Sequence, residues 1–384
     1  MGFEQLAYVN EVGGGQRSIR EASSRTSILA QMADSQIRHG IPIGVDYGTA
    51  ILYDGMALAI AASGANGKGK ENWTLVDWYA AQIAPTVYPN GTIWTFNYTY
   101  YSLDSYRFGN NILYWYTRLL NSDGIRSMYH LHPRNSAGGF WHRAPDYPNQ
   151  IFYARYTSLF QPENTTAWDD ILLQYELYLS HTRNDTLKLT NHGYDESRTA
   201  VWANNVTGSS PLVWDRPDGR FYSSLLECLE SWPEEHEGRA VLEGYFRYLS
   251  EGFLRAQDKE SGGWWLVMNP EYVDVTGNYI ESSATAMFTH GMLSGIQLGL
   301  LDRETYLEPA LKAYDLMVDQ WVVDAGDGTL NWLDTVVVGS LGSNTTFQYY
   351  ISVPTDVNNY KRIGPFMWSA YHGRDHGAPL RRVR

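Results

Sequence analysis

Residues suited to ligand binding gather in the stretch 191–233, NHGYDESRTAVWANNVTGSSPLVWDRPDGRFYSSLLECLESWP. His192, Trp202, Trp214 and Arg216 stand there in a polar, glycine- and serine-rich loop, just before an apolar run that predicts a helix. Scaffolds commonly carry their binding groups on such loops. Aromatic faces with polar tips also suit stacking on sugar rings. The alternative is that these aromatic side chains pack the core and the loop is only a connection.

The overall charge limits the classes of partner. The 384 residues carry a net charge of −13 and no long basic run, which argues against binding to nucleic acid. An anionic substrate would therefore need local arginine or lysine side chains. No apolar run approaches the length of a membrane span. Cys228 is the only cysteine, so an internal disulfide is excluded, and its apolar surroundings predict a buried thiol.

Glycosylation sequons indicate an extracellular protein. Seven Asn-X-Ser/Thr sites occur, at Asn72, Asn90, Asn97, Asn164, Asn184, Asn205 and Asn344. The polar start, MGFEQLAYVNEVGGGQRS, shows no apolar signal-peptide core. We expect an extracellular location on the strength of the sequons, although the first residues do not support it.

Helical periodicity organises most of the chain. Helical stripes of apolar residues, or runs rich in small and apolar residues, predict helices over 27–39, 50–63, 72–84, 166–181, 238–257, 281–300 and 304–323. Thr166 and Asp169 are spaced as a capping box for one of them. Only TVVVGSL and FQYYISV read as strands, and we expect them to pair as a peripheral hairpin. The chain shows no phosphate-binding loop, metal-ligand spacing or serine-hydrolase elbow.

These patterns predict an all-α protein of about ten to twelve helices joined by long loops rich in Gly, Trp and Tyr. Such an alternation suits an α/α barrel, in which paired helices form a double ring. A helical-repeat solenoid is the competing architecture, but no fixed period is visible. We expect one domain over 25–375, a disordered tail over 1–24 and a short tail over 376–384.

Several longer motifs resemble those of glycoside hydrolase family 105, especially of its fungal members. In chain order they are YSLDSYRFGNN, HPRNSAGGFWHR, DYPNQ, NTTAWDDILLQ, HGYDESRTAVW, SPLVWDR, SGGWWLVM and GNYIESSATAMF. The match extends from about Ser24 to Met367. The resemblance implies a six-hairpin α/α barrel, with the β-hairpin at its periphery, and the activity of an unsaturated rhamnogalacturonyl hydrolase.

That family removes the Δ4,5-unsaturated uronic acid that pectin lyases leave at the non-reducing end of their products. The resemblance therefore implies a small unsaturated oligosaccharide as substrate. It also implies hydration of a vinyl ether by a carboxyl group that gives and then accepts a proton, with no metal or organic cofactor. Such a carboxyl needs a raised pKa and hence partial burial. The oligomeric state is not predicted.

The resemblance also suggests site residues. Asp104 matches the first of the family's two active-site Asp positions, and without the resemblance it could equally be a carboxylate at a helix start. His192 would hydrogen-bond the sugar, Trp214 would stack on it, and Arg216 would engage polar or anionic groups. Two further residues of a matched motif, expected on the wall of the cleft, are Trp141 and His142.

The second catalytic Asp of the family has no counterpart. The family follows its Tyr-Pro-X-Gln stretch with a Leu-Asp-Gly motif, whereas this chain reads DYPNQIFYARYTSLF. An ungapped match places Ala154 at the Asp position and Arg155 at the Gly position. A gapped match instead removes roughly ten residues, the Asp among them. The nearest carboxylate is Asp146, which we expect to act with Asp104 if the loop is rebuilt around it.

A second departure follows Arg216. Where the family has a small-apolar-Gly-Trp run, this chain has PDGR, so Arg220 replaces the second stacking tryptophan. Three hypotheses result. The chain is an active unsaturated uronyl hydrolase, or a degenerate saccharide-binding relative without activity, or an enzyme with new chemistry that uses Asp104, Asp218 and Arg220.

Overall fold

Helices account for most of the computed structural model, which describes residues 27–65, 73–89, 92–94, 104–119, 137–139, 148–342 and 344–373. The α-helices within these ranges are α2 (Ile28–His39), α3 (Tyr47–Ala65), α4 (Trp73–Ile83), α5 (Asp104–Leu119), α6 (Pro148–Phe160), α7 (Thr165–Thr182), α8 (Asp215–Ser231), α9 (Gly238–Ala256), α10 (Ser282–Gln297), α11 (Arg303–Leu316), α12 (Phe347–Ser352) and α13 (Tyr360–His372). A π-helical turn, Met317–Trp321, extends α11.

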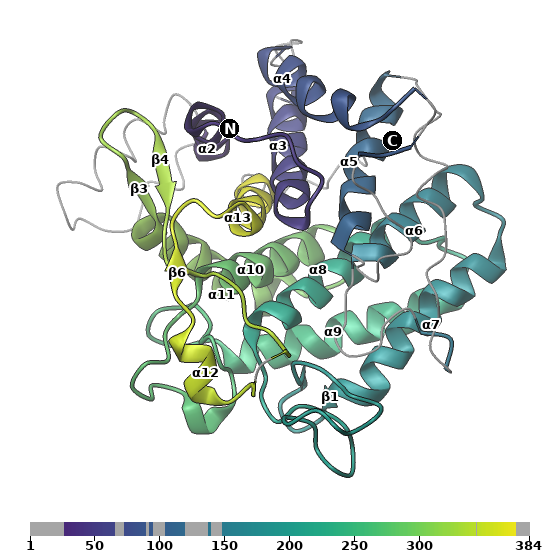
Figure 1. Ribbon diagram of the computed structural model, residues 1–384, viewed down its shortest axis with the longest axis vertical. Helices are drawn as coiled ribbons and strands as arrows, with labels where there is room; N and C mark the ends of the chain where they lie inside the picture. Colours follow the sequence, from purple (N-terminus) through teal and green to yellow (C-terminus); the bar gives the residue numbers. More distant parts are fainter. Residues whose placement is uncertain are drawn as a thin grey trace.

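Six of these helices close into an inner ring. Each of α3, α5, α6, α8 and α10 packs against the next helix in this order, α10 packs on α13, and α13 packs back on α3 (Figure 1). Helices α2, α4, α7, α9 and α11 lie outside the ring. The first four directly precede an inner helix, whereas the short strands and α12 stand between α11 and α13. Most of the segment before α6 lies outside the described residues. The predicted all-α, six-hairpin barrel is confirmed.

Helix α3 shows how the inner ring divides its faces. Tyr47, Ile51, Asp54 and Leu58 follow at intervals of four, three and four, so they share one face of the helix. Tyr47 and Ile51 form a small cluster there with Met287 of α10 and Trp368 of α13, and Leu58 packs against it. Because α10 and α13 are also inner helices, this face of α3 points into the ring interior.

The opposite face of α3 joins the main hydrophobic core, which fills the space between the inner and outer helices. Burying a leucine or phenylalanine there contributes about 1.5–3 kcal/mol relative to exposure. The contact of α3 with α13 is especially close, because Gly364 of α13 lies against the backbone carbonyl of Ile51. A β-carbon at position 364 would collide with that carbonyl, so glycine is required where the ring closes.

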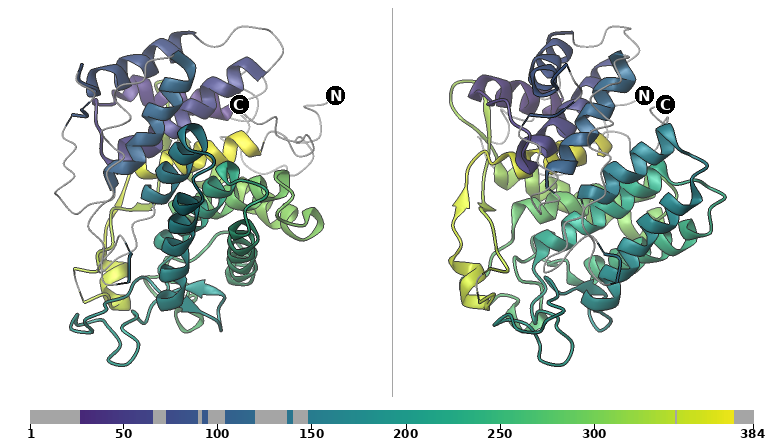
Figure 2. Two further views of the ribbon diagram at one scale, coloured as in Figure 1. Left: turned by 90° about the vertical axis from the view of Figure 1, so that its right-hand side faces the viewer. Right: turned by 45° about the vertical axis from the view of Figure 1, so that its right-hand side comes forward.

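The strands are short and peripheral. Within the described ranges they form three antiparallel pairs, β1 (Arg183–Asn184) with β2 (Leu189–Thr190), β3 (Val322–Asp324) with β4 (Leu330–Trp332), and β5 (Thr335–Val336) with β6 (Thr355–Asp356). Figure 2 shows the last two pairs and α12 along the edge of the helices.

The predicted hairpin of TVVVGSL with FQYYISV is wrong in its second half. Only the start of the first segment is a strand, and it pairs with β6, whereas FQYYIS forms helix α12. Thr346 caps this helix by accepting a hydrogen bond from the Tyr349 amide at 3.2 Å. Phe347 and Tyr350, three residues apart, are its buried residues. Burial at a spacing of three suits a helix and not the alternation of a strand.

The predicted capping box of α7 is also wrong. The cap is Asn164, whose side chain accepts a hydrogen bond from the Ala167 amide at 3.2 Å, so the helix begins at Thr165. The predicted tails, 1–24 and 376–384, lie outside the described residues, and the single domain over 25–375 stays a prediction. Within the described ranges, no helix is long and apolar enough to cross a membrane.

Candidate functional site

The N-termini of four inner helices meet at one end of the ring. Arg216, in the first turn of α8, contacts the Ser283 hydroxyl at the start of α10. Arg362, in the first turn of α13, donates to the Val337 carbonyl, to which Arg216 also donates. Tyr47, the first residue of α3, lies under Arg220 of α8. Because helix N-termini carry partial positive charge, this end of the ring favours an anionic group.

His192 and Trp214 form an aromatic pair at this end. The His192 amide donates to the Leu212 carbonyl at 2.9 Å, which holds the loop after β2 against the segment that enters α8. The two ring centroids lie 4.7 Å apart in an edge-to-face arrangement. Nδ1 of His192 is hydrogen-bonded to the Tyr350 hydroxyl. Burial, together with the charges of Arg220 and Arg216, lowers the pKa of His192 to about 3, so its imidazole is neutral at ordinary pH.

Arg216 directs its donors at groups of the protein. Its Nη1 donates to the Val337 carbonyl at 3.1 Å, its Nη2 donates to the Val336 carbonyl, and its Nε lies 3.3 Å from Ser283 Oγ. The Glu281 carboxylate is 3.6 Å away. Only 3% of the Arg216 side chain is exposed. In this arrangement Arg216 fastens a neighbouring segment to the start of α8.

That segment, residues 335–342, is called the strap. Besides its carbonyls on Arg216, it places Gly339 against the indole of Trp214, and its Leu341 carbonyl accepts from Trp202 Nε1 at 2.7 Å. A β-carbon on Gly339 would lie 2.8 Å from the Trp214 ring. The exposed fraction is 4% for Trp214 and 6% for His192. The strap therefore covers Trp214 of the aromatic pair.

The acidic residues beside Arg216 are buried. Asp215 is fully buried, and among the described residues neither of its carboxyl oxygens has a hydrogen-bond partner within normal geometry. Burial and the nearby Glu281 carboxylate raise the pKa of Asp215 well above its usual value. Glu281 itself caps α10 by accepting from the Ala284 amide at 2.8 Å.

Asp218, one of the groups proposed for new chemistry, is also fully buried. It accepts hydrogen bonds from the Thr190 amide, at 3.2 Å, and from the Thr190 hydroxyl. Burial raises its pKa well above the usual value. These contacts fasten β2 to α8, and the chemical role of Asp218 stays a prediction.

Arg220 reaches across the ring interior. Helices α8 and α3 are three positions apart in the ring in either direction, so they lie opposite each other. The guanidinium carbon of Arg220 nevertheless lies 4.0 Å from the centroid of the Tyr47 ring. Arg220 is half-buried, unlike the neighbouring residues of α8, which are buried.

A layer of charged residues lies deeper in the ring. Arg107 of α5 contacts Asp54 Oδ2 of α3 at 2.6 Å and Glu227 Oε1 of α8 at 2.9 Å. Arg155 of α6 pairs with the other oxygen of Glu227 at 2.9 Å. Asn111 donates to the remaining oxygen of Asp54 at 2.7 Å. Four inner helices are therefore joined by one ion-pair network, which we call the charged layer.

The remaining predicted site residues have different outcomes. Asp104 is the first residue of α5, one turn before Arg107. Trp141, His142 and Asp146 lie outside the described residues. Ala154 is buried in the main core, and Arg155 belongs to the charged layer. The structure thus brings His192, Trp214 and Arg216 together, and the roles assigned to these residues stay predictions.

Three residues of this site were missed. Tyr350 lies in the segment predicted as a strand, and Tyr47 lies outside the motifs that resemble the family. Glu281 belongs to the motif GNYIESSATAMF, where its place just before an apolar helical run was a signal for a helix cap.

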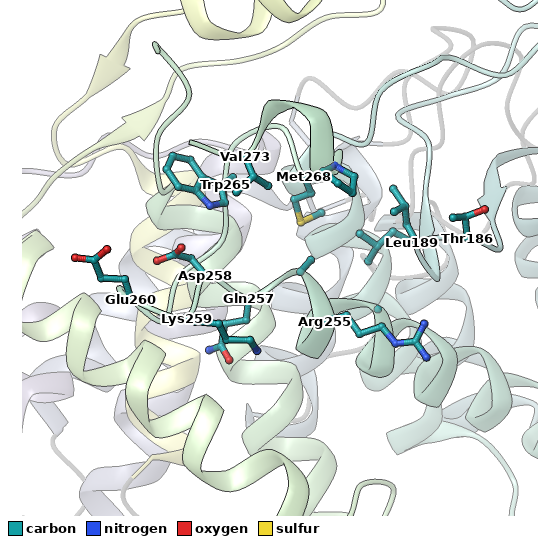
Figure 3. A pocket seen from close by; sticks show the side chains of 14 residues that line it. Thr186, Leu189, Arg255, Gln257, Asp258, Lys259, Glu260, Trp265, Met268 and Val273 are labelled. Carbon is teal, nitrogen blue, oxygen red and sulfur yellow. The ribbon is translucent and has the colours of Figure 1, made fainter. Parts of the chain in front are cut away.

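A separate cavity of about 520 Å³ lies at the end of α9, beside the connection from α7 to α8. Figure 3 shows Leu189, Trp265 and Met268 on its apolar wall, with Arg255 and Glu260 toward its edges. It contains none of the predicted site residues. Within the described part of the chain, no group of three His, Cys, Asp or Glu side chains could hold a metal ion.

Comparison with known proteins places these features in context. Residues 27–374 match the family model described as Glycosyl Hydrolase Family 88. Protein Atu3128 of Agrobacterium fabrum is 31% identical over 229 residues, which cover 57% of this chain and 94% of that protein. The unsaturated 3S-rhamnoglycuronyl hydrolase of Formosa agariphila is 28% identical over 128 residues, covering 33% of this chain and 31% of that enzyme.

Solved structures agree with this match. A family 105 glycoside hydrolase of C. acetobutylicum superposes with a TM-score of 0.84 at 26% identity, over 91% of this chain and 99% of that structure. The unsaturated glucuronyl hydrolase of Bacillus sp. GL1 has a TM-score of 0.63 at 13% identity, over 92% and 96% of the two chains. The second likeness concerns the fold alone.

Proposed function

Because this chain belongs to glycosyl hydrolase family 88 and is a glycoside hydrolase, we propose that it removes a Δ4,5-unsaturated uronic acid from the non-reducing end of an oligosaccharide. The rhamnoglycuronyl hydrolase among its relatives supports this class of substrate. On the resemblance of its motifs, the preferred substrates are unsaturated rhamnogalacturonan fragments produced by pectin lyases.

The observation that carries the proposal is the end of the ring where the N-termini of α3, α8, α10 and α13 meet. A uronic acid carries a negative charge. At this end of the ring that charge would be stabilised by the converging helix dipoles and by the positive charges of Arg216, Arg220 and Arg362. The aromatic pair His192 and Trp214 lies at the same end, where the strap covers Trp214, so stacking of a sugar ring on this indole stays an expectation from the resemblance.

The proposed reaction is hydration of the C4=C5 double bond. A carboxylic acid gives its proton to C4, water adds its oxygen to C5, and the second proton of that water returns to the carboxylate. The hemiketal at C5 then opens to a ketone, and the partner sugar leaves from C1. We assign the carboxyl to Asp104, at the start of α5, with Asp146 as the second group.

A second candidate function is saccharide binding without turnover. Alanine and arginine carry no carboxyl group, so Ala154 and Arg155 of α6 cannot replace the missing acid. Ala154 is buried in the main core, and Arg155 is paired with Glu227. In the ungapped match these are the positions of the family's Asp and Gly. This observation favours a degenerate member that keeps the fold and has lost the second acid.

The replacement Asp104→Asn tests the two functions. With the wild type, the ultraviolet absorbance of an unsaturated rhamnogalacturonan disaccharide should fall as its double bond is hydrated. The Asp104→Asn variant should be slower by about 10²–10⁴-fold, because a positioned general acid and base contributes that much. The control is Asp77→Asn, an exposed carboxylate on α4, which should react at the wild-type rate.

One result would contradict the assignment of Asp104, and another would contradict the hydrolase activity. An Asp104→Asn variant that reacts normally would remove Asp104 from the mechanism. A folded wild type that binds the disaccharide and leaves the absorbance unchanged would favour the non-catalytic function.

We also propose that the protein is glycosylated and extracellular. Among the described sequons, Asn164, Asn205 and Asn344 are exposed, so an oligosaccharide transferase could reach them. Protein secreted from a eukaryotic host should lose mass on treatment with peptide N-glycosidase. An unchanged mass after this treatment would rule out N-glycans.

A further inference from the structure

The cavity at the end of α9 is framed by defined contacts. The turn between β1 and β2 brings the Lys188 carbonyl against Gly252 of α9, where a β-carbon would collide with that carbonyl. Toward the other end of the cavity in Figure 3, Asp258 accepts hydrogen bonds from the amide and the hydroxyl of Ser261, at 2.6 and 2.7 Å. These bonds fix the turn that follows α9. Since contacts of the fold hold both ends, the cavity is a built feature of this chain.

The size and the wall of the cavity suit a small ligand with an apolar face. Its volume is about 520 Å³, within the range of roughly 300–1,000 Å³ that is usual for small-molecule sites. The wall carries the indole of Trp265 together with Leu189, Met268 and Val273 (Figure 3). Trp265 is partly exposed, so its ring is open on one side. An aromatic face of this kind suits the apolar C–H face of a pyranose ring.

Hydrogen-bonding groups of both kinds stand at the edges of the cavity. Glu260 is exposed and makes no hydrogen bond or ion pair with the described residues, so its carboxylate is open to a donor. Arg255 is exposed too, and the only bond of its guanidinium within those residues is the one from Nη2 to Glu251. In Figure 3 Glu260 lies toward Trp265, whereas Arg255 lies toward Leu189. The cavity therefore offers an acceptor and a donor at different ends.

This combination favours a neutral saccharide over other small ligands. A sugar hydroxyl both donates and accepts, so one molecule can meet a carboxylate at one end and a guanidinium at the other. A purely apolar ligand would cover these charges without pairing them. A compact anion would leave the apolar wall in contact with water. Because the chain is a glycoside hydrolase, saccharides are also ligands that it encounters.

The segment 264–268 separates the cavity from the aromatic pair. Val267 forms an isolated antiparallel bridge with Trp214, and the two residues pack in one hydrophobic cluster. From the same segment, Trp265 and Met268 line the cavity. A ligand in the cavity would therefore lie beside the outer helix α9, apart from the end of the ring to which the proposed function assigns the unsaturated sugar.

We propose that this cavity is a second saccharide site, which binds a neutral mono- or disaccharide unit. The C–H face of a pyranose ring lies on Trp265, and its hydroxyl groups bond to Glu260 and Arg255. Binding here requires neither a double bond nor a uronic carboxylate, and it does not involve Asp104. The protein would thus hold a neutral part of a carbohydrate at a place distinct from the one where hydration is proposed.

Equilibrium binding of neutral disaccharides tests the proposal. The probes are galactobiose, cellobiose and mannobiose, which carry no carboxylate and no double bond, and binding is followed by saturation-transfer NMR. At least one of them should bind with a dissociation constant at or below about 1 mM. The strongest saturation should fall on the C–H protons of one ring face. Octanoate, an apolar chain with a carboxylate, is the comparison ligand and should bind more weakly than the best disaccharide.

Three variants locate the bound sugar. Glu260→Gln removes the charge from one hydrogen bond and should weaken binding about 5-fold. Trp265→Ala removes the stacking surface and should weaken it about 10-fold. Ala256→Phe, at a position that lines the cavity, should fill the cavity and prevent binding. The control is Glu163→Gln, an exposed carboxylate between α6 and α7, which should keep the wild-type affinity. Circular dichroism checks that each variant is folded.

The outcomes separate this site from the proposed function. If none of the three disaccharides binds, or if octanoate binds in their place, the saccharide site is wrong. It is also wrong if folded Glu260→Gln and Ala256→Phe bind the sugar as the wild type does. In these cases the hydrolase stands, because its readout is the ultraviolet absorbance of the unsaturated disaccharide. If that absorbance does not change while the variants lose neutral disaccharides as expected, the hydrolase fails and the second site stands.

Discussion

Two buried arginines organise two regions of the ring, and they are held in different ways. Arg107 in the charged layer lies 2.6 and 2.9 Å from carboxylates on α3 and α8. Arg216 lies against two strap carbonyls and a serine hydroxyl, and its nearest carboxylate is 3.6 Å away. Burial lowers the pKa of Arg216, whereas around Arg107 the carboxylates outweigh burial and raise the pKa.

The comparison separates scaffold from site. In the charged layer every partner of Arg107 belongs to an inner helix, so the network holds the ring itself together. The partners of Arg216 include the carbonyls of a connecting segment, and such contacts with neutral groups are weaker than those with ions. The strap is therefore fastened to the site, not built into the ring, and its carbonyls are held by the buried guanidinium groups of Arg216 and Arg362.

The largest effect is expected from breaking the charged layer. Glu227→Gln leaves Arg107 and Arg155 without their shared carboxylate, so the free energy of unfolding should fall by about 3–5 kcal/mol. Urea denaturation measures the change. The control, Glu243→Gln, removes a more exposed carboxylate paired with Arg239 and Arg247 on α9, and its effect should be much smaller. Equal losses in the two variants would mean that the charged layer does not stabilise the ring.

A smaller effect is expected at the strap. In Gly339→Ala the new methyl group would lie 2.8 Å from Trp214, so the strap must shift, at a cost of about 1–3 kcal/mol in unfolding free energy. The matched control is Gly244→Ala, at an exposed position of α9 with open space around it, where alanine should be neutral or slightly stabilising. A variant at Gly339 as stable as the wild type would show that the strap does not press on the indole.

The helical elements were predictable because their signals are local. The pattern over 238–257 predicts a helix, which is confirmed as α9, Gly238–Ala256. The hairpin prediction failed at Phe347, where β-propensity suggested a strand but Thr346 and the burial of Phe347 and Tyr350 determine a helix. In that segment side-chain burial outweighed intrinsic preference.

The site was predictable only in part. His192, Trp214 and Arg216 are close in the sequence, and the structure brings them together. Tyr47 and Tyr350 reach the same region from distant parts of the chain, and no local pattern reports such contacts. The partnership of Arg220 with Tyr47 follows from the position of α8 opposite α3, which depends on closure of the whole ring.

Closure of the ring by α13 on α3 has a consequence for how the protein is made. The two helices stand almost the whole length of the chain apart, so their contact is among the most non-local in the fold. Non-local contacts form late, because the entropy of closing the intervening loop must be overcome first. During synthesis, the apolar face of α3 that receives Gly364 remains uncovered until α13 has left the ribosome. The nascent chain thus depends on α13, and truncation before this helix should yield an aggregating product.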